Sequence, residues 1–262
     1  MNLIEFNLFS NGKRKAVTFS YDDGHIYDER LVDLFDKKGV KCTFNLNACL
    51  IGQKGYISSS FVRNISERHE IACHSYSHPV LKNQPISRII SELYEDKVAL
   101  EEIVGRPVCG MAYPYGSYDE NVKNALRASG ILYSRTTERN TSFTFPSDFL
   151  EWHPNCHHNV AIERAKEFVE INGNMSLLYI WGHSHEFENQ HNWNVMEELL
   201  HILAGRNDIW YATNIELYDY KKSVQSLRVS LNGKSVYNPS AITVYATVNG
   251  KPTAFEPGLT VL

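Results

Sequence analysis

Two adjacent carboxylates, Asp22 and Asp23, follow an apolar run typical of a buried β-strand. The run covers residues 16–21 and leads into Asp22-Asp23-Gly24. Asp-Asp-Gly is also good turn chemistry, and alone it favours an ordinary turn. The carboxyl ends of the strands form the active-site face of β/α barrels. A catalytic interpretation of the two aspartates therefore becomes favoured only if other reactive side chains follow neighbouring strands.

Two histidines, His74 and His78, follow a second strand-like run at residues 70–73. The i, i+4 spacing allows one turn to direct both imidazoles at one metal ion. Spacing alone is weak evidence among 11 histidines, and His153 and His157 form another such pair. The first pair stands out because it follows a strand, as Asp22 does.

Two further strand-like runs end in groups that can act on a substrate. Residues 107–113 lead into Pro114-Tyr115-Gly116, a rigid turn that either presents a backbone N–H to a substrate oxygen or is an ordinary β–α turn. Residues 177–181 lead to His183, which alone would more often be structural.

Together these segments resemble the polysaccharide deacetylases with a NodB homology domain, carbohydrate esterase family four. That family carries, in this order, Thr-Phe-Asp-Asp-Gly, His-Ser/Thr-x-x-His, Arg-Pro-Pro-Tyr-Gly, Asp-x-x-Asp-Trp and Leu-x-His. The resemblance covers about residues 15–220. The counterparts here are residues 20–24, 74–78, 112–116, 148–152 and 180–183.

The resemblance implies a divalent metal ion held by Asp23, His74 and His78. Two imidazoles and one carboxylate fit zinc, although cobalt, nickel or iron(II) also accept such ligands. The expected cofactor is therefore one divalent ion per chain, with zinc favoured.

The resemblance also implies the other site residues. Asp22 is expected to be the general base that deprotonates a metal-activated water, and His183 the general acid that protonates the leaving group. Tyr115 would contribute its backbone N–H to an oxyanion hole, and Pro114 and Trp152 complete the expected substrate-binding set. Trp152 suits stacking on a sugar ring, but an aromatic residue is equally at home in the core.

The sequence departs from the family pattern at several positions. Ala112 stands where many members have an arginine that orients the base, so either another cation does this or the base is tuned differently. Glu151 replaces a motif aspartate, which leaves Asp148 or an unidentified residue to orient His183. His185 lies so close to His183 that it is a second, less favoured choice for the acid.

These residues predict a metal-dependent hydrolase that removes acetyl groups from an N-acetylated or O-acetylated carbohydrate. A second interpretation is hydrolysis of a non-glycan amide on the same barrel, because a fold does not settle a substrate. A third is a catalytically weakened carbohydrate-binding protein, suggested by Ala112 and the loose fourth motif. Retention of both Asp22 and His183 argues against the third.

The elements that must position these residues alternate between short strands and amphipathic helices up to about residue 222, which predicts an α/β fold, a distorted (β/α)7 TIM-like barrel. Helical patterns precede Gly39, Gly105 and Gly205, which are plausible helix stops. Residues 1–222 are assigned to the catalytic barrel. Seven strands are expected, at residues 15–21, 40–47, 70–73, 107–113, 131–135, 177–181 and 208–213.

Residues 223–262 change to strict alternation around two Asn-Gly pairs, the strongest short signal for β-hairpins. About 40 residues are marginal as an independent domain. We therefore expect a small C-terminal β-hairpin appendage that packs on the barrel and takes no part in the chemistry.

Composition limits the partners and the compartment. Of 262 residues 43% are hydrophobic and 21% charged, and the net charge of −4 offers nucleic acid or anionic membranes no electrostatic attraction. Five scattered cysteines predict free thiols and a reducing compartment. No export signal or membrane span is evident, which predicts a cytoplasmic protein and favours acetylated oligosaccharides or small molecules over polymer.

Overall fold

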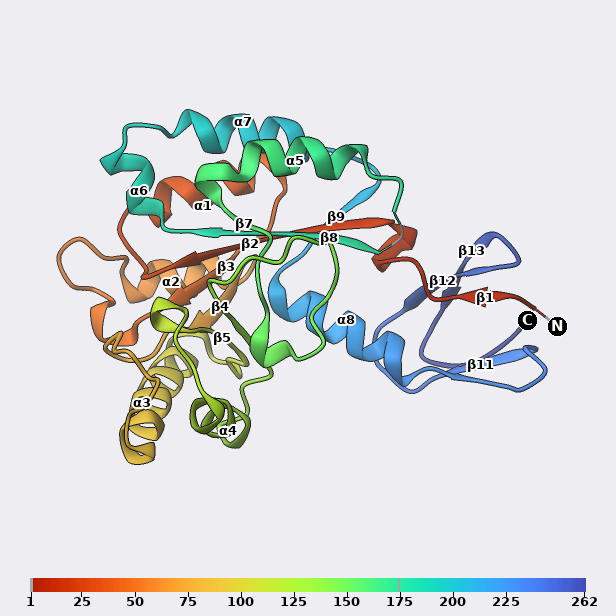
Figure 1. The fold of residues 1–262 in the computed structure, drawn as a ribbon, viewed down its shortest axis with the longest axis horizontal. Helices are drawn as coiled ribbons and strands as arrows, with labels where there is room; N and C mark the ends of the chain where they lie inside the picture. The colour runs from red at the N-terminus through yellow and green to blue at the C-terminus, as the bar shows by residue number, and fades with distance from the viewer. Residues whose placement is uncertain (1, 174) are drawn as a thin grey trace.

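The computed structural model describes residues 2–173 and 175–262, and its main element is a curled parallel β-sheet (Figure 1). The strand order is β6-β5-β4-β3-β2-β8-β7, and β9 pairs with the first residues of β2. The sheet forms the predicted distorted TIM-like barrel, in which β6 and β7 are the edge strands of this path. The strands are β2 (Lys15–Asp22), β3 (Thr43–Leu46), β4 (Glu70–Cys73), β5 (Gly110–Ala112), β6 (Tyr133–Arg135), β7 (Cys156–His157), β8 (Ser176–Gly182) and β9 (Ile209–Tyr211).

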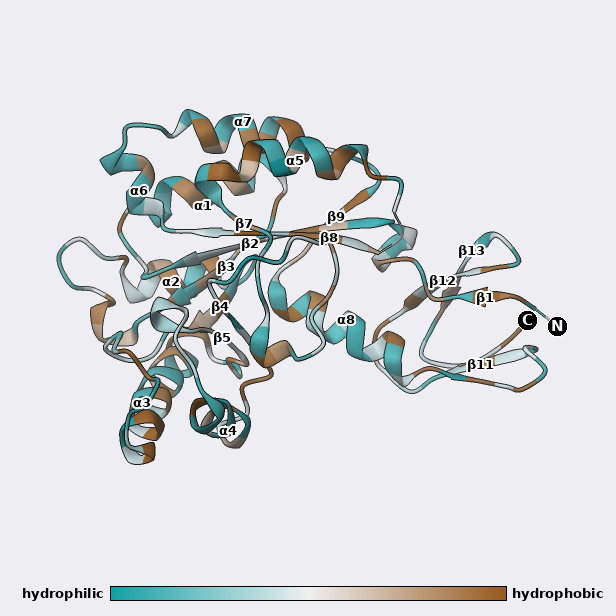
Figure 2. Ribbon diagram, viewed as in Figure 1, coloured by the Kyte–Doolittle hydropathy of each residue, from teal (hydrophilic) through white to brown (hydrophobic). Residues whose placement is uncertain are grey.

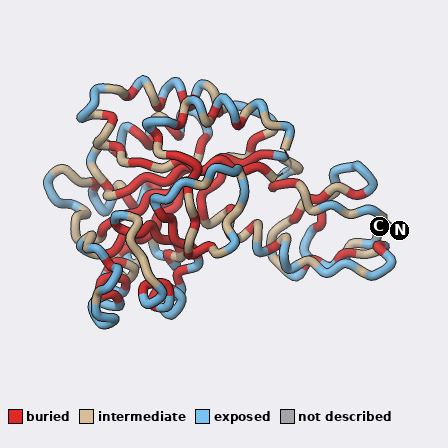
Figure 3. The backbone as a smooth tube through the Cα atoms, in the orientation of Figure 1, coloured by how far each residue is buried: buried red, intermediate tan, exposed pale blue. Residues whose placement is uncertain are grey.

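Alternate residues of the central strands enter two different cores. On β2, Val17 and Phe19 pack under the outer helices, whereas Ala16 faces the second core. On β8, Ile180 enters the first core and Tyr179 the second. This period of two follows from the pleat, and burial on both faces explains why the strands are continuous apolar runs (Figures 2 and 3).

The helices complete the two layers. Helices α1, α5, α6 and α7 cover one side of β2 and β8, and α8 lies on the other side (Figure 1). The predicted stops hold for α1 and α3, which end at Gly39 and Gly105 in left-handed conformation, while α7 ends at Ala204, one residue before Gly205. The helices are α1 (Asp28–Lys38), α2 (Ser59–Ile65), α3 (Ile86–Val104), α4 (Glu120–Ala128), α5 (Ala161–Glu170), α6 (Ser184–Asn189), α7 (Asn194–Leu203) and α8 (Asn214–Ser226).

The C-terminal segment forms small antiparallel sheets around its own core, which includes Val236, Ala246 and Phe255. Asn249-Gly250 is the tight turn between β12 and β13, as predicted, and Asn232-Gly233 lies in the connection from β10 to β11. The strands are β10 (Arg228–Val229), β11 (Ser235–Asn238), β12 (Val244–Val248), β13 (Lys251–Phe255) and β14 (Gly258–Val261).

The N-terminal strand β1 (Ile4–Glu5) pairs with β12, so the first residues join the appendage rather than the parallel sheet. The appendage meets the rest of the chain near the amino end of β2, where the Tyr220 hydroxyl of α8 bonds to the Leu8 carbonyl and accepts the Tyr245 N–H. Figure 1 shows it projecting from that end. The division at residue 222 stays a prediction.

All five cysteines are free thiols in the structure, as the sequence predicts. Within the described ranges, no helix combines the length and apolar character that crossing a membrane requires.

Candidate active site

The carboxyl ends of β2, β4 and β8 bring predicted groups together, and the end of β6 adds Arg135, which was not predicted. Asp22 ends β2, His74 directly follows β4, Arg135 ends β6, and His183 directly follows β8. A cavity of about 450 Å³ lies over these ends, lined by Asp22, Asp23, His74, His78, Tyr113, Tyr115, Thr137, Trp181, His183, His185 and Glu186.

The neighbouring aspartates point in different directions. Asp22 is 2% exposed and accepts a hydrogen bond from Asn45 Nδ2 at 2.8 Å. Asp23 has a positive φ of 79°, is half-buried, and faces the two histidines. The left-handed turn at Asp23 therefore separates an inner carboxylate from one directed into the cavity.

Asp23, His74 and His78 converge as a metal-ligand set. His74 Nε2 lies 3.6 Å from Asp23 Oδ1, His78 Nε2 lies 3.7 Å from the same oxygen, and the two Nε2 atoms are 3.1 Å apart. These separations match the roughly 3.3 Å edge of a tetrahedron with metal–ligand bonds of about 2.0–2.1 Å. His74 Nδ1 lies 2.7 Å from the Ala112 carbonyl, which only accepts, so Nδ1 carries the hydrogen and the Nε2 lone pair faces the cluster. The residues fit a divalent ion.

Backbone strain concentrates around this cluster. Ser75, His78 and Tyr115, like Asp23, have positive φ angles, between 57° and 62° for these three. Such conformations cost about 1–3 kcal/mol each for non-glycine residues and occur mainly where function requires them. The observed strain supports a functional role for this end of the sheet.

Two buried acids that the sequence did not reveal hold the histidine segment in place. Asp96 accepts the N–H of His74 at 2.9 Å and the N–H of Ala48 at 2.8 Å. Glu92 accepts both the N–H and the hydroxyl of Ser77. Both acids come from α3, so one helix positions the turn that carries the two imidazoles.

Arg135 supplies the cation that Ala112 does not. Its guanidinium forms an ion pair with Asp22 Oδ2, is 1% exposed, and lies over the Trp181 ring at 4.4 Å. Burial alone would raise the pKa of Asp22, but Arg135, His74 and the Asn45 hydrogen bond outweigh it and lower that pKa.

His183 lies, like His74, near both aspartates. Its Nε2 lies 3.9 Å from Asp22 Oδ2 and 3.9 Å from Asp23 Oδ2. Burial alone would lower the pKa of His183, but contact with Glu186 and the two aspartates outweighs it and raises that pKa. His185, the less favoured choice, packs against His25 at 5.6 Å between ring centres.

The carboxylate beside His183 is that of Glu186, and Asp148 lies elsewhere. Glu186 Oε1 lies 3.3 Å from His183 Nδ1. Asp148 instead caps a 3₁₀ turn through the Leu150 N–H and pairs with Lys123 at 3.0 Å. The fourth motif of the family therefore has no counterpart at this site.

The predicted substrate-binding residues have different surroundings. Tyr115 is 66% exposed, with its ring 4.6 Å from the His78 ring, and Pro114 is buried in the same 3₁₀ turn, Pro114–Gly116. The expected stacking of Trp152 on a sugar ring is not possible in this structure, because Trp152 is 1% exposed and packs edge-on against Tyr133 and Tyr179. A ring buried in the second core offers no face to a sugar.

The second histidine pair of the sequence does not form a unit. His153 Nδ1 contacts the Thr136 hydroxyl at 2.6 Å, whereas His157 lies beside His158 and Glu186. His157, His158 and Glu186 are close enough to one another to be a second group of potential metal ligands.

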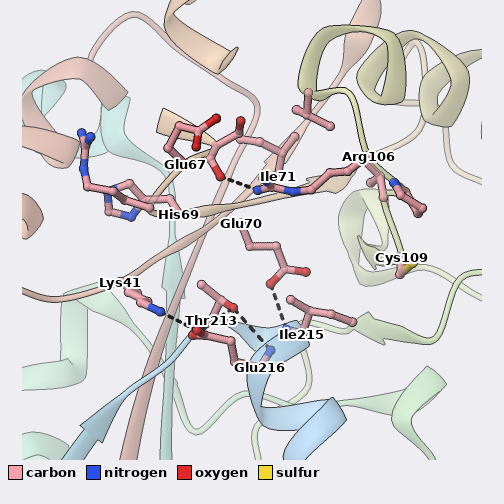
Figure 4. Close-up of a pocket in the computed structure, with 15 residues that line it drawn as sticks. Lys41, Glu67, His69, Glu70, Ile71, Arg106, Cys109, Thr213, Ile215 and Glu216 are labelled. Carbon is pink, nitrogen blue, oxygen red and sulfur yellow. Dashed lines mark hydrogen bonds and ion pairs between the residues drawn. The ribbon is translucent and has the colours of Figure 1, made fainter. Parts of the chain in front are cut away.

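Another cavity, of about 240 Å³, lies at the amino ends of the strands (Figure 4). Its central acid, Glu70, accepts hydrogen bonds from Tyr133, Thr43 and the Ile215 N–H. Burial raises the pKa of Glu70 to about 7. These bonds commit both carboxylate oxygens to the fold, and this end of a β/α barrel usually serves stability rather than chemistry.

Residues 10–134, which carry Asp22, Asp23, His74 and His78, match the family model for polysaccharide deacetylase. The matched segment, just under half of the chain, is similar to polysaccharide deacetylases. Arg135 lies one residue beyond the matched segment.

Individual relatives match parts of the chain. A probable peptidoglycan-N-acetylglucosamine deacetylase from Arthroderma benhamiae is 35% identical over 42% of this chain and 26% of that protein. A chitin deacetylase from Pestalotiopsis is 35% identical over 44% of this chain and 37% of its own length. The matches thus span about a quarter to over a third of these curated relatives.

The fold is shared more widely than the sequence. The crystal structure of a putative polysaccharide deacetylase from Mycobacterium smegmatis matches with a TM-score of 0.63 and 17% identity, over 83% of this chain and 93% of that one. At this identity the match supports the fold, the distorted barrel, and not a shared substrate.

Proposed function

We propose that this protein is a metal-dependent hydrolase that removes acetyl groups from an N-acetylated or O-acetylated carbohydrate. One observation carries the proposal: Asp22 and His183, from different strands, lie beside a three-ligand cluster, and each has a charged partner of its own. A carboxylate base and an imidazole acid beside a metal site are the groups that metal-assisted acyl hydrolysis requires.

Asp23, His74 and His78 would hold the metal ion, for which zinc is the best fit. When bound, such an ion acts as a Lewis acid toward the acetyl carbonyl and lowers the pKa of water. His74 suits the role because burial lowers its pKa and keeps the imidazole neutral.

Asp22 is the proposed general base. Arg135 and Asn45 hold its carboxylate in one orientation, and its lowered pKa keeps it ionised at neutral pH, ready to accept a proton. His183 is the proposed general acid. Its raised pKa maintains a protonated fraction near neutrality, and its Nε2 faces the cavity side where the leaving group departs.

Tyr115 is proposed to contribute in two ways. Its backbone N–H would stabilise the oxyanion, an interaction worth about 3 kcal/mol at one donor. Its exposed ring beside His78 would contact the sugar. Pro114 fixes the turn that presents both groups.

Carbohydrate is the proposed substrate because the curated relatives are named for chitin and peptidoglycan deacetylation. An acetylated oligosaccharide or polysaccharide is therefore preferred to a non-glycan amide. A catalytically weakened carbohydrate-binding protein is less favoured, since Arg135 and Glu186 provide Asp22 and His183 with charged partners.

Acetate release from N-acetylglucosamine oligomers, with and without a chelator, tests the proposal. The zinc-loaded protein should release acetate, and chelation should stop it. An active protein that acts only on non-glycan amides would favour the second interpretation, and a protein that binds oligomers without releasing acetate would favour the third.

The two aspartates allow a sharper test. Asp22→Asn should keep the metal and lose kcat, because an amide cannot accept the proton, whereas Asp23→Asn should weaken metal binding and be partly rescued by excess metal. Asp33→Asn, on the exposed surface of α1, is the matched control. If both site variants kept full metal and near-normal rates, the mechanism would be wrong.

A further inference from the structure

Glu186 is surrounded by three imidazoles. Its Oε1 lies 3.3 Å from His183 Nδ1, and its Oε2 lies 3.0 Å from the Nε2 atoms of both His157 and His158. The four residues come from α6, from the residue before it, and from the segment that contains β7. One carboxylate thus links the cavity histidine to two histidines behind it.

We propose, on the basis of the function proposed above, that Glu186 is the positioning residue that fixes the tautomer of His183. An ionised carboxylate attracts N–H groups and repels nitrogen lone pairs, so this ion-pair contact at 3.3 Å favours a hydrogen on the facing Nδ1. The Nε2 atom, 3.9 Å from Asp22 and from Asp23, is then the nitrogen that exchanges a proton with the substrate. Glu186 acts through His183 and needs no contact with the reacting atoms.

His157 and His158 hold Glu186 from the other side. The Asn159 N–H donates to His157 Nδ1 at 3.4 Å, and the Tyr21 hydroxyl lies 3.4 Å from His158 Nδ1. An Nδ1 that accepts leaves the hydrogen on Nε2, which is the atom that faces Glu186 in both rings. Oε2 of Glu186 is therefore opposite two N–H groups.

The His158 ring is rigidly placed. It is fully buried, stacked between Tyr21 and Phe187 with ring-centre distances of 5.8 and 4.1 Å. A Cβ atom at residue 182 would lie 2.0 Å from His158 Nδ1, so only glycine at Gly182 permits this packing. Burial lowers the pKa of His158 to about 4, so it stays a neutral donor.

The same three groups, His157, His158 and Glu186, form the second potential ligand set. A metal ion there would require the Nε2 lone pairs, which conflicts with the Asn159 N–H that His157 Nδ1 accepts. The contacts favour a cluster held by carboxylate–imidazole ion pairs, and binding of a second metal ion is an outcome that the experiment distinguishes.

The test is Glu186→Gln, which is nearly isosteric. Because two N–H groups face the Oε2 position, the amide oxygen should settle there and turn its NH₂ group toward His183. Nδ1 must then accept, so the ring is held neutral with its hydrogen on Nε2 and does not readily form the imidazolium that a general acid requires. In serine protease triads, where the histidine acts first as a base, the equivalent carboxylate-to-amide change favours the wrong tautomer and lowers kcat about 10⁴-fold.

Two readouts are needed, both on the whole 262-residue chain. At a pH where the His183 ring is neutral, nitrogen-15 NMR should show its hydrogen on Nδ1 in the wild type and on Nε2 in Glu186→Gln. In the zinc-loaded protein, kcat for acetate release should fall about 10²- to 10⁴-fold while KM stays within about twofold. Glu186→Asp keeps an accepting carboxylate and should retain the Nδ1–H tautomer with an intermediate kcat. This variant keeps the proposal testable if Glu186→Gln folds poorly.

The matched control is Glu188→Gln, on the same helix. The Glu188 side chain accepts a hydrogen bond from Trp193 Nε1–H and forms no ion pair with a histidine among the described residues. It should keep the wild-type tautomer and kcat. An unchanged His183 tautomer with normal kcat in Glu186→Gln would overturn the proposal, as would loss of one of two bound zinc ions in that variant. If the wild type released no acetate from any substrate, the proposed function would fail, while the NMR result would still decide the role of Glu186.

Discussion

The ion pair between Arg135 and Asp22 gives the most demanding test of this site. The guanidinium and the carboxylate are 1% and 2% exposed. Arg135→Met removes the charge but keeps an apolar stem, so it leaves Asp22 with the Asn45 hydrogen bond and without its cation.

The expected loss follows from this burial. Removing one partner of a buried pair costs about 3–5 kcal/mol, because the remaining charge is uncompensated. His183, 3.9 Å from Asp22 Oδ2, provides some compensation, so we expect about 3 kcal/mol. A domain with 5–15 kcal/mol of stability stays folded after that loss.

A double-mutant cycle isolates the pair. Urea unfolding at pH 7 of the wild type, Arg135→Met, Asp22→Asn and the double variant should give a coupling of about 2–3 kcal/mol, because the double variant leaves no buried charge unpaired. The folded pKa of Asp22 lies below its unfolded value of 3.8, so this stabilisation is present above pH 3.8 and is lost as the pH falls through the lowered folded pKa.

The same variants test the chemistry. Arg135→Met should lower kcat by about 10²- to 10³-fold and keep its metal, since the three ligands are unchanged. Arg127→Met, which removes a half-exposed surface cation, should change stability by no more than about 1 kcal/mol. A coupling below about 0.5 kcal/mol, or a wild-type kcat in Arg135→Met, would refute this account of the base.

Three other predictions concern metal, pH and the appendage. Metal analysis should find one divalent ion per chain, lost in His78→Ala and retained in His157→Ala, and the reverse result would reject the assignment. Asp28 is buried and its pKa is raised from 3.8 to about 8, so the free energy of unfolding should fall as the pH rises between these values. Urea unfolding should show that Asp28→Asn is more stable than the wild type by on the order of a few kcal/mol at pH 8 and by little at pH 4. Deleting residues 223–262 should lower Tm without removing the metal, since this segment contributes no side chain to the described cavity lining, but a folded deletion without activity would give the appendage a part in the cleft.

The fold was accessible from sequence where the signals are local. Apolar runs and glycine stops located the seven predicted strands, although the run at 107–113 yields only Gly110–Ala112 as strand. Strand β7 escaped because two residues, Cys156–His157, carry no periodicity. Strand β1 escaped because its partner, Val244–Val248, lies more than 230 residues away in the chain.

The site was accessible only in part, for a related reason. Asp22, Asp23 and His74 stand in ordered motifs after strands, which sequence shows directly. Glu186 and Arg135 act through partners that only the folded chain brings near, although a cation at the carboxyl end of a predicted strand was itself a signal. The position of Trp152 in the motif led to a wrong prediction of sugar stacking, because its burial in the second core depends on neighbours from several strands.

The strand register explains how a chain with Ala112 can still position its base. Ala112 of β5 and Arg135 of β6 are paired residues of adjacent parallel strands. An arginine side chain at either position therefore starts from a neighbouring backbone site and can extend toward the same carboxylate. Ala112 is fully buried, and Arg135→Ala would vacate volume next to it. Ala112→Arg combined with Arg135→Ala should therefore recover at least tenfold in kcat over Arg135→Ala alone, measured by acetate release at equal zinc content. Ala112→Arg alone should destabilise the protein, because two guanidinium groups would compete for one buried space beside one carboxylate. If the double variant were no more active than Arg135→Ala, the location of the charge on β6, and not only its presence, would be required for the base.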